Sequence, residues 1–283
     1  MVALFPLPGA AASALNLLAK VIARNPDQRE VSIVRASTEI DWEWAVRTDG
    51  LLSDAQRRKL SLDMERVVTG LVAGRPRTAG AQRGTGRLDF ADLRLPDSSL
   101  ARAAETEARE QLSSHVLGHS YRTYFFGRVL ADLAGVRYDD ELCYVSCLLH
   151  DLQLEHPTPG RCFAVAGAHR AIEFVTSAGA TPEVAQAIGA AIAAHITPGT
   201  DADLGNAGGF IAAGASADVA GARLSKFDPA WVAELLERHP RHEFKRHMIA
   251  ALTAEAAAVP HGRTSWLIGR GALPKIEASP FAE

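Results

Sequence analysis

Cysteine, long apolar runs and an excess of charge of either sign are all scarce in this chain of 283 residues. The three cysteines, an odd number without framework spacing, exclude a disulfide scaffold and favour a reducing, intracellular setting. The formal net charge of −3 gives no indication of nucleic acid or an anionic membrane as a partner. The apolar N-terminus contains two early prolines and lacks a preceding basic segment, so we predict neither a signal peptide nor a membrane span and expect a cytoplasmic protein.

Strand-like alternation of Val, Ile and Thr is also scarce, whereas alanine is abundant and apolar residues recur every three or four positions. This pattern predicts an all-α fold, and the chain is long enough to bury a sizeable core. The predicted helices cover residues 11–24, 53–72, 100–135, 138–152, 162–178, 182–195, 208–223, 229–238 and 241–258. Residues 30–36 are the only strand candidate, and the stretch beyond 258 is predicted to be irregular.

Residues 73–97 are dominated by Gly, Pro and Arg, which predicts a loop. Its RGTGR stretch lacks the strand–turn–helix context of a phosphate-binding loop, which favours a solvated arginine-rich segment. We therefore divide the chain into a helical N-terminal extension with its loop, residues 1–95, and a main domain of residues 96–283. Two of the cysteines, Cys143 and Cys147, lie four apart on a predicted helix with apolar neighbours, and we interpret them as core residues rather than metal ligands.

Histidines and aspartates lie on the apolar sides of five consecutive predicted helices. A single one of them would be an ordinary core residue, but each uncompensated group costs roughly 1–3 kcal/mol or more in desolvation. A shared cation would remove that cost for all of them, and imidazole and carboxylate are suitable ligands. The residues are His119, the adjacent pair His150 and Asp151, His169, His195 and Asp218.

The adjacent pair His150-Asp151 closes the run CYVSCLLHDL. Neighbouring helix positions point about 100° apart, so the two side chains cannot face one distant partner. They can both reach an ion near the end of the helix, where side chains converge. We therefore interpret both residues as metal ligands.

The order His119, His150-Asp151, Asp218 resembles the H…HD…D pattern of the HD-domain superfamily of metal-dependent hydrolases. His169 and His195 fit the extended pattern that holds two metals, and the resemblance covers about residues 95–225. The words LPDSSLARAAE, HSYRTYFFG, LLHDL and EASPFAE are similar to the cyanamide hydratase-like branch, which hydrates the nitrile of cyanamide to urea at a zinc site. Leu152-Gln153 follows the HD pair here, where Ile-Gly is common.

The resemblance implies a helical bundle around a buried divalent metal, with zinc favoured and one or two iron ions as the alternative. His119, His150, Asp151 and Asp218 would hold the first metal. With a second metal, Asp151 would bridge and His169 and His195 would complete its ligand shell. With one metal, His169 and His195 would act as proton donors or substrate-binding groups.

Three other activities remain open alongside a nitrile hydratase. A phosphohydrolase acting on a nucleotide or other phosphoester would need cations near the metal, and Arg122 and Arg170 lie beside motif histidines. Arg122, on nearly the same helix face as His119, would bind substrate or else point into solvent.

A di-iron oxygenase and a non-catalytic ligand-sensing module are the other two alternatives. The site helices are otherwise apolar, which favours a small, weakly charged substrate, and the alanine-rich surface is compatible with a homodimer.

The other histidines are interpreted more simply. His115 lies one turn before His119 and is either a partly exposed residue or a contact behind the ligands. His156 would border the entrance to the site. Four histidines in a polar region are interpreted as surface residues: His239, His242, His247 and His261. We also expect the 73–97 loop or the apolar tail residues Trp266, Leu267 and Ile268 to cover the pocket mouth.

Overall fold

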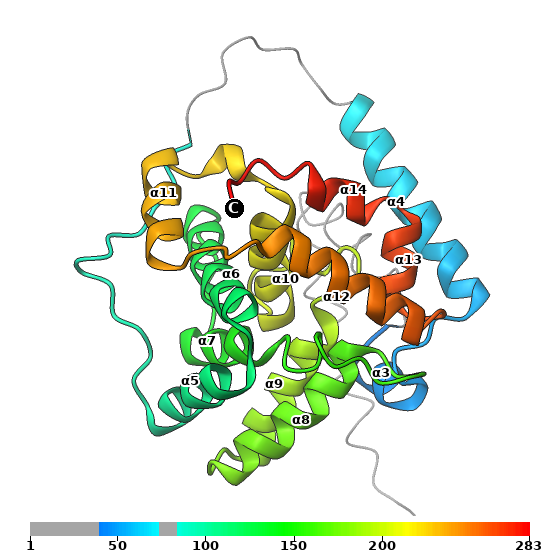
Figure 1. Ribbon diagram of the computed structural model, residues 1–283, viewed down its shortest axis with the longest axis horizontal. Coiled ribbons are helices and arrows are strands. Elements are labelled where there is room, and N and C mark those ends of the chain that lie inside the picture. Colours follow the sequence, from blue (N-terminus) through cyan, green and yellow to red (C-terminus); the bar gives the residue numbers. More distant parts are fainter. Residues whose placement is uncertain (1–39, 74–83) are drawn as a thin grey trace, which may run out of the picture. The chain divides into compact units, whose positions relative to one another are not determined.

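The computed structural model describes residues 40–73 and 84–283, and these ranges contain helices and no β-strand (Figure 1). The predictions for residues 11–24 and 30–36 lie outside the described residues. The α-helices are α3 (Trp42–Thr48), α4 (Asp54–Ala73), α5 (Ser99–Gln111), α6 (Ser114–Leu133), α7 (Asp140–Leu149), α8 (Phe163–Ser177), α9 (Pro182–Ala194), α10 (Ala207–Ala220), α11 (Pro229–Arg238), α12 (Phe244–Ala258), α13 (Arg263–Gly269) and α14 (Ala272–Glu277).

The helix starts follow from local sequence. Thr181 accepts a hydrogen bond from the Val184 N–H and Pro182 occupies the first turn of α9, as predicted. Asp228 caps α11 in the same way, again followed by a proline. At the start of α4, Ser53 and Gln56 exchange side chain-to-backbone hydrogen bonds in a capping box.

The prediction of one helix over residues 100–135 is wrong, because the chain breaks at Leu112 and Ser113. The Ser113 side chain accepts a hydrogen bond from the Val116 N–H and begins a new helix, so α5 ends at Gln111 and α6 starts at Ser114. The break lets α5 fold back and pack against α7. The prediction of an irregular stretch beyond 258 is also wrong, since α13 and α14 lie there.

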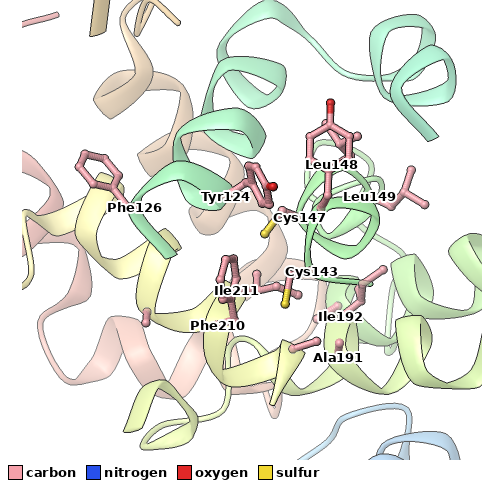
Figure 2. Packing of buried hydrophobic residues seen from close by; sticks show 14 of the residues in the cluster. Tyr124, Phe126, Cys143, Cys147, Leu148, Leu149, Ala191, Ile192, Phe210 and Ile211 are labelled. Atoms are coloured by element: carbon pink, nitrogen blue, oxygen red, sulfur yellow. The ribbon is translucent and has the colours of Figure 1, made fainter. Parts of the chain in front are cut away.

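Helix α6 runs through the middle of the core and is buried on every side from Val116 to Ala131, apart from Leu117 and Arg128. It packs most closely against α10 and also contacts α7, and Figure 2 shows apolar side chains of these helices and of α9 around Cys143 and Cys147. Cys143 and Cys147 are fully buried in this packing, which confirms their interpretation as core residues. Burial raises the pKa of Cys143 to about 12, so its thiol stays protonated.

Two glycines permit the close crossing of α6 and α10. A Cβ atom at Gly214 of α10 would collide with the backbone carbonyl oxygen of Thr123 in α6, and one at Gly127 would meet the ring of Phe210. Thr123 lies one turn after His119, and Gly214 lies one turn before Asp218. The crossing therefore brings His119 and Asp218 face to face.

The described residues, 40–73 and 84–283, fall within one compact unit, which includes α3 and α4. Within the described ranges, no helix combines the length and apolar character that a membrane crossing requires. The described part of the 73–97 loop pairs with the backbone of Lys226 and Asp228 through Gly86. Its Phe90 ring stacks on Trp231 of α11.

Candidate metal centre

Three predicted ligands lie together in the core. His119, His150 and Asp151 each offer one ligand atom, and these atoms lie within 4.8 Å of one another. All three side chains are buried, with exposed fractions of 3% or less. His119 comes from the middle of α6, whereas His150 follows the last residue of α7 and Asp151 begins the turn after it. The predicted convergence at a helix end is confirmed for the HD pair.

Two helices present a histidine in the same way at their C-termini. His150 is the C-cap of α7, and its Nδ1 lies 2.7 Å from the Cys147 carbonyl oxygen, three residues back. His195 is the C-cap of α9, and its Nδ1 lies 2.6 Å from the Ile192 carbonyl oxygen, also three residues back. A carbonyl only accepts, so Nδ1 carries a proton in both rings, and in the neutral form of each ring the lone pair is on Nε2.

His119 reaches the same state through a carboxylate. Its Nδ1 lies 2.7 Å from Asp218 Oδ2 and donates to it, which leaves the Nε2 lone pair pointing away from Asp218. The Phe244 ring stacks on the imidazole with centroids 4.9 Å apart, which fixes the plane of the ring. A carboxylate behind a ligating imidazole is a common support in metal sites, because it sets the tautomer and raises the basicity of the ligand.

The three Nε2 atoms converge on Asp151. The His119 and His150 Nε2 atoms lie 3.3 Å apart, with Asp151 Oδ2 3.7 Å from the first and 3.3 Å from the second. His195 Nε2 lies 3.8 Å from the other carboxylate oxygen, Oδ1. Two buried lone pairs facing each other at 3.3 Å repel unless a proton or cation lies between them. The donor set therefore fits a divalent ion, and His119, His150 and Asp151 could hold one.

The charges of these residues depend on the cluster itself. Burial lowers the pKa of His119 and brings the pKa of His195 to about 3, so both imidazoles are neutral at pH values near 7. Burial acts on His150 in the same direction, but the adjacent Asp151 carboxylate raises its pKa. Burial alone would raise the pKa of Asp151, yet the three imidazoles around it hold the pKa below its usual value.

The Asp218 carboxylate does not join the ligand group. The resemblance places Asp218 among the first metal's ligands, but both of its oxygens bind other side chains. Arg122 binds both oxygens at 2.8 and 3.0 Å, and Arg241 binds Oδ1 at 2.7 Å. Although burial alone would raise the pKa of Asp218, Arg122 and His119 hold it below its usual value. In this structure Asp218 supports His119 from behind instead of facing the Nε2 cluster.

The expectations for Arg122 are corrected by the structure, since the side chain is neither exposed nor available to a substrate. It is fully buried and donates twice to Asp218 and once each to the carbonyl oxygens of His239 and Pro240. Four of its five N–H donors are therefore used inside the protein. Arg122 holds Asp218 in place.

The expectation that His169 completes the metal site is also corrected. Gly167, two residues earlier on α8, faces the His150 backbone, and two helix positions span about 200°. His169 therefore points to the other side of α8, where its ring lies against Trp42 with centroids 5.5 Å apart. Of the predicted ligands, the structure brings together His119, His150, Asp151 and His195, leaves Asp218 behind His119, and places His169 elsewhere.

Other expectations have mixed outcomes. His115 does not join the ligand group, and its Nε2 lies 2.8 Å from Glu155 Oε1. His239 is not a surface residue, because it is half-buried against Tyr121 with ring centroids 4.7 Å apart. Sequence analysis missed Arg241 as a partner of Asp218. Arg241 lies outside any helix and 23 residues after Asp218 in the chain, and no sequence motif marks it.

The tail residues that we expect to cover the pocket mouth form part of a helix instead. Trp266 is buried in α13, and Leu267 and Ile268 belong to the same helix. The tail nevertheless reaches the support of the site, because Glu283 Oε1 lies 3.1 Å from Arg241 Nε and the Phe281 ring lies against the same guanidinium.

No protein-family model matches this chain, and no curated protein sequence matches it.

Proposed function

We propose that the chain is a metal-dependent hydratase or hydrolase of the HD type, with zinc as the favoured ion. The observation that carries the proposal is the convergence of the buried imidazoles of His119, His150 and His195 on the Asp151 carboxylate. Each imidazole has an acceptor at Nδ1, which fixes the ring and directs its Nε2 toward the cluster. Buried groups organised in this way are typical of a catalytic metal centre.

A bound divalent ion supplies an activated water near neutral pH and polarises an electrophile. The protein contributes four groups to the same chemistry. His119 and His150 offer Nε2 ligands, and Asp151 presents one oxygen to them and the other to His195. His195 is neutral because burial lowers its pKa to about 3, so its Nε2, 3.8 Å from Asp151 Oδ1, can accept a hydrogen bond from a bound water or substrate.

The surroundings support a small, weakly charged substrate such as a nitrile, with hydration of cyanamide to urea as the favoured reaction. A phosphoester would need cationic groups free to meet its oxygens. Arg122 and Arg241 are committed to Asp218. Arg170, the other sequence candidate, donates to Glu107, Gln111 and the Leu152 carbonyl oxygen.

The test is the metal content of the purified protein followed by assay of urea formation from cyanamide. We expect about one zinc per chain and metal-dependent hydration. His150→Ala should lose the metal and the activity, whereas His156→Ala, the same change at an exposed histidine six residues later, should keep both. A full metal content in His150→Ala would contradict the ligand assignment, and zinc-loaded protein without hydratase activity would contradict the substrate.

A second candidate function is a di-iron oxygenase, and one observation favours it. The two oxygens of Asp151 face different partners, Oδ2 the pair His119 and His150, and Oδ1 His195. A carboxylate divided in this way is suited to bridging two ions. Two irons per chain in the same metal analysis would favour this function over hydration.

A further inference from the structure

A second site lies on the surface between α4 and α13, built from residues that the metal centre does not use. A cavity of about 490 Å³ opens there, within the size range of small-molecule pockets. Its lining comes from the first half of α4 and from α13 with the residue that follows it. The lining residues are Arg57, Arg58, Ser61, Leu62, Ser265, Trp266, Gly269 and Arg270.

The lining is strongly cationic. It contains three arginines and no Asp or Glu, although the chain as a whole carries a net charge of −3. Within the described residues, neither Arg57 nor Arg58 forms an ion pair with a carboxylate. Many other described arginines form ion pairs with Asp or Glu: Arg102, Arg109, Arg161, Arg170, Arg223, Arg238, Arg241 and Arg246. Arg57 and Arg58 therefore bring positive charge to the cavity that no described carboxylate pairs with.

The polar groups of the lining are mainly donors. Arg270 donates to the Ser61 hydroxyl and lies over the Trp266 ring, 5.7 Å from its centroid. Arg57 donates one N–H to the Pro260 carbonyl oxygen at 2.9 Å, which fixes α4 beside the start of α13. Its Nε and the Nε1 of Trp266, which is 5% exposed, are buried N–H groups that find no acceptor in the described part of the chain. The described part of the chain therefore leaves two N–H donors without an acceptor beside the cavity.

We propose that this cavity binds a small, multiply charged oxyanion carrying phosphate or carboxylate groups. Guanidinium groups form paired hydrogen bonds with both kinds of oxyanion. Arg57 and Arg58 on α4 provide the charge, and Trp266 and Leu62 provide an apolar wall for the rest of the ligand. The cavity shares no residue with the candidate metal centre, so anion binding can be tested separately from the proposed hydration.

The test is calorimetric titration of the full chain with pyrophosphate and, in a separate arm, with citrate. We expect saturable binding of at least one of them at one site per chain, weakening as salt is added. Arg58→Ala should weaken it about tenfold or more, because a charge-assisted contact contributes at least ~1.4 kcal/mol. Arg58 is exposed, so its replacement should not unfold the protein.

The matched control is Lys59→Ala, which removes one positive charge from the next position of α4 but lies outside the cavity lining. It should bind as tightly as the wild type. A preference for pyrophosphate over citrate would identify phosphate as the ligand chemistry, and the reverse preference would identify carboxylate. Three results would overturn the proposal: no saturable binding of either anion, equal effects of Arg58→Ala and Lys59→Ala, or binding that is lost in His150→Ala but unaffected by Arg58→Ala.

Discussion

Replacing Arg122 by alanine tests whether this residue supports the metal centre or meets a substrate. The guanidinium is fully buried, binds both oxygens of Asp218 and lies over the Phe244 ring at 5.1 Å. Its removal leaves a buried carboxylate with Arg241 and His119 as its remaining partners. Breaking a buried ion pair by removing one partner costs about 3–5 kcal/mol, and we expect a loss of unfolding free energy in this range.

The assay is urea denaturation followed by far-ultraviolet circular dichroism, combined with metal analysis of the folded protein. Metal retention should fall as well, because Asp218 holds the tautomer and orientation of His119. Arg246→Ala is the matched control, since its ion pair with Glu243 is exposed and should contribute only about 0.2–1 kcal/mol.

A double-mutant cycle separates the ion pair from other effects of the substitution. The double variant Arg122→Ala/Asp218→Ala should lose less stability than the sum of the two single variants, because it no longer leaves this carboxylate without its guanidinium. A loss below about 1 kcal/mol in Arg122→Ala, with full metal content, would refute the supporting role. A substrate-binding residue would instead change the Michaelis constant and leave stability and metal content intact.

Three further predictions concern packing and pH. Gly214→Ala should destabilise the fold by about 1–3 kcal/mol and reduce metal content, because the added Cβ collides with the backbone at Thr123; an unchanged melting temperature would contradict the close crossing. Burial and Arg122 lower the pKa of His239 to about 4, so the wild type should lose up to about 3 kcal/mol of unfolding free energy as the pH falls from 6.5 towards 4. In His239→Phe this part of the loss should be absent from urea melts across that range. Burial raises the pKa of Glu255 above the value it has in the unfolded chain. The stability that Glu255 contributes is therefore lost as the pH rises from the unfolded-state pKa through the folded-state pKa. Glu255→Gln should consequently be more stable than the wild type at neutral pH in the same urea melts.

The helices and the HD pair were predictable because their signals are local. The N-cap residues Thr181 and Asp228 mark helix starts through their own side chains, and the structure confirms both. His150 lies at the end of an apolar helical run, so its position near a helix terminus could be derived from the sequence. The break at Ser113 was missed because the apolar periodicity continues across it, although serine is a favoured N-cap residue.

The roles of individual site residues were less predictable because they depend on how helices pack. Periodicity placed both Asp218 and His169 on apolar faces. It could not show that Asp218 meets two arginines, one from a loop after α11, or that His169 faces Trp42. These contacts join positions far apart in the sequence, and sequence analysis could not determine the packing of their elements.

If the centre holds an ion as proposed, the Nδ1 hydrogen bonds of the histidines couple ion binding to folding. The carbonyl acceptors of His150 and His195 exist only when α7 and α9 have ended where they do, and the unfolded chain cannot assemble the cluster. An ion held there binds the folded chain alone, and it adds RT ln(1 + [M]/Kd) to the unfolding free energy. The melting temperature of the protein should therefore rise with free metal concentration, which makes thermal stability a measure of how much of the ion its surroundings provide.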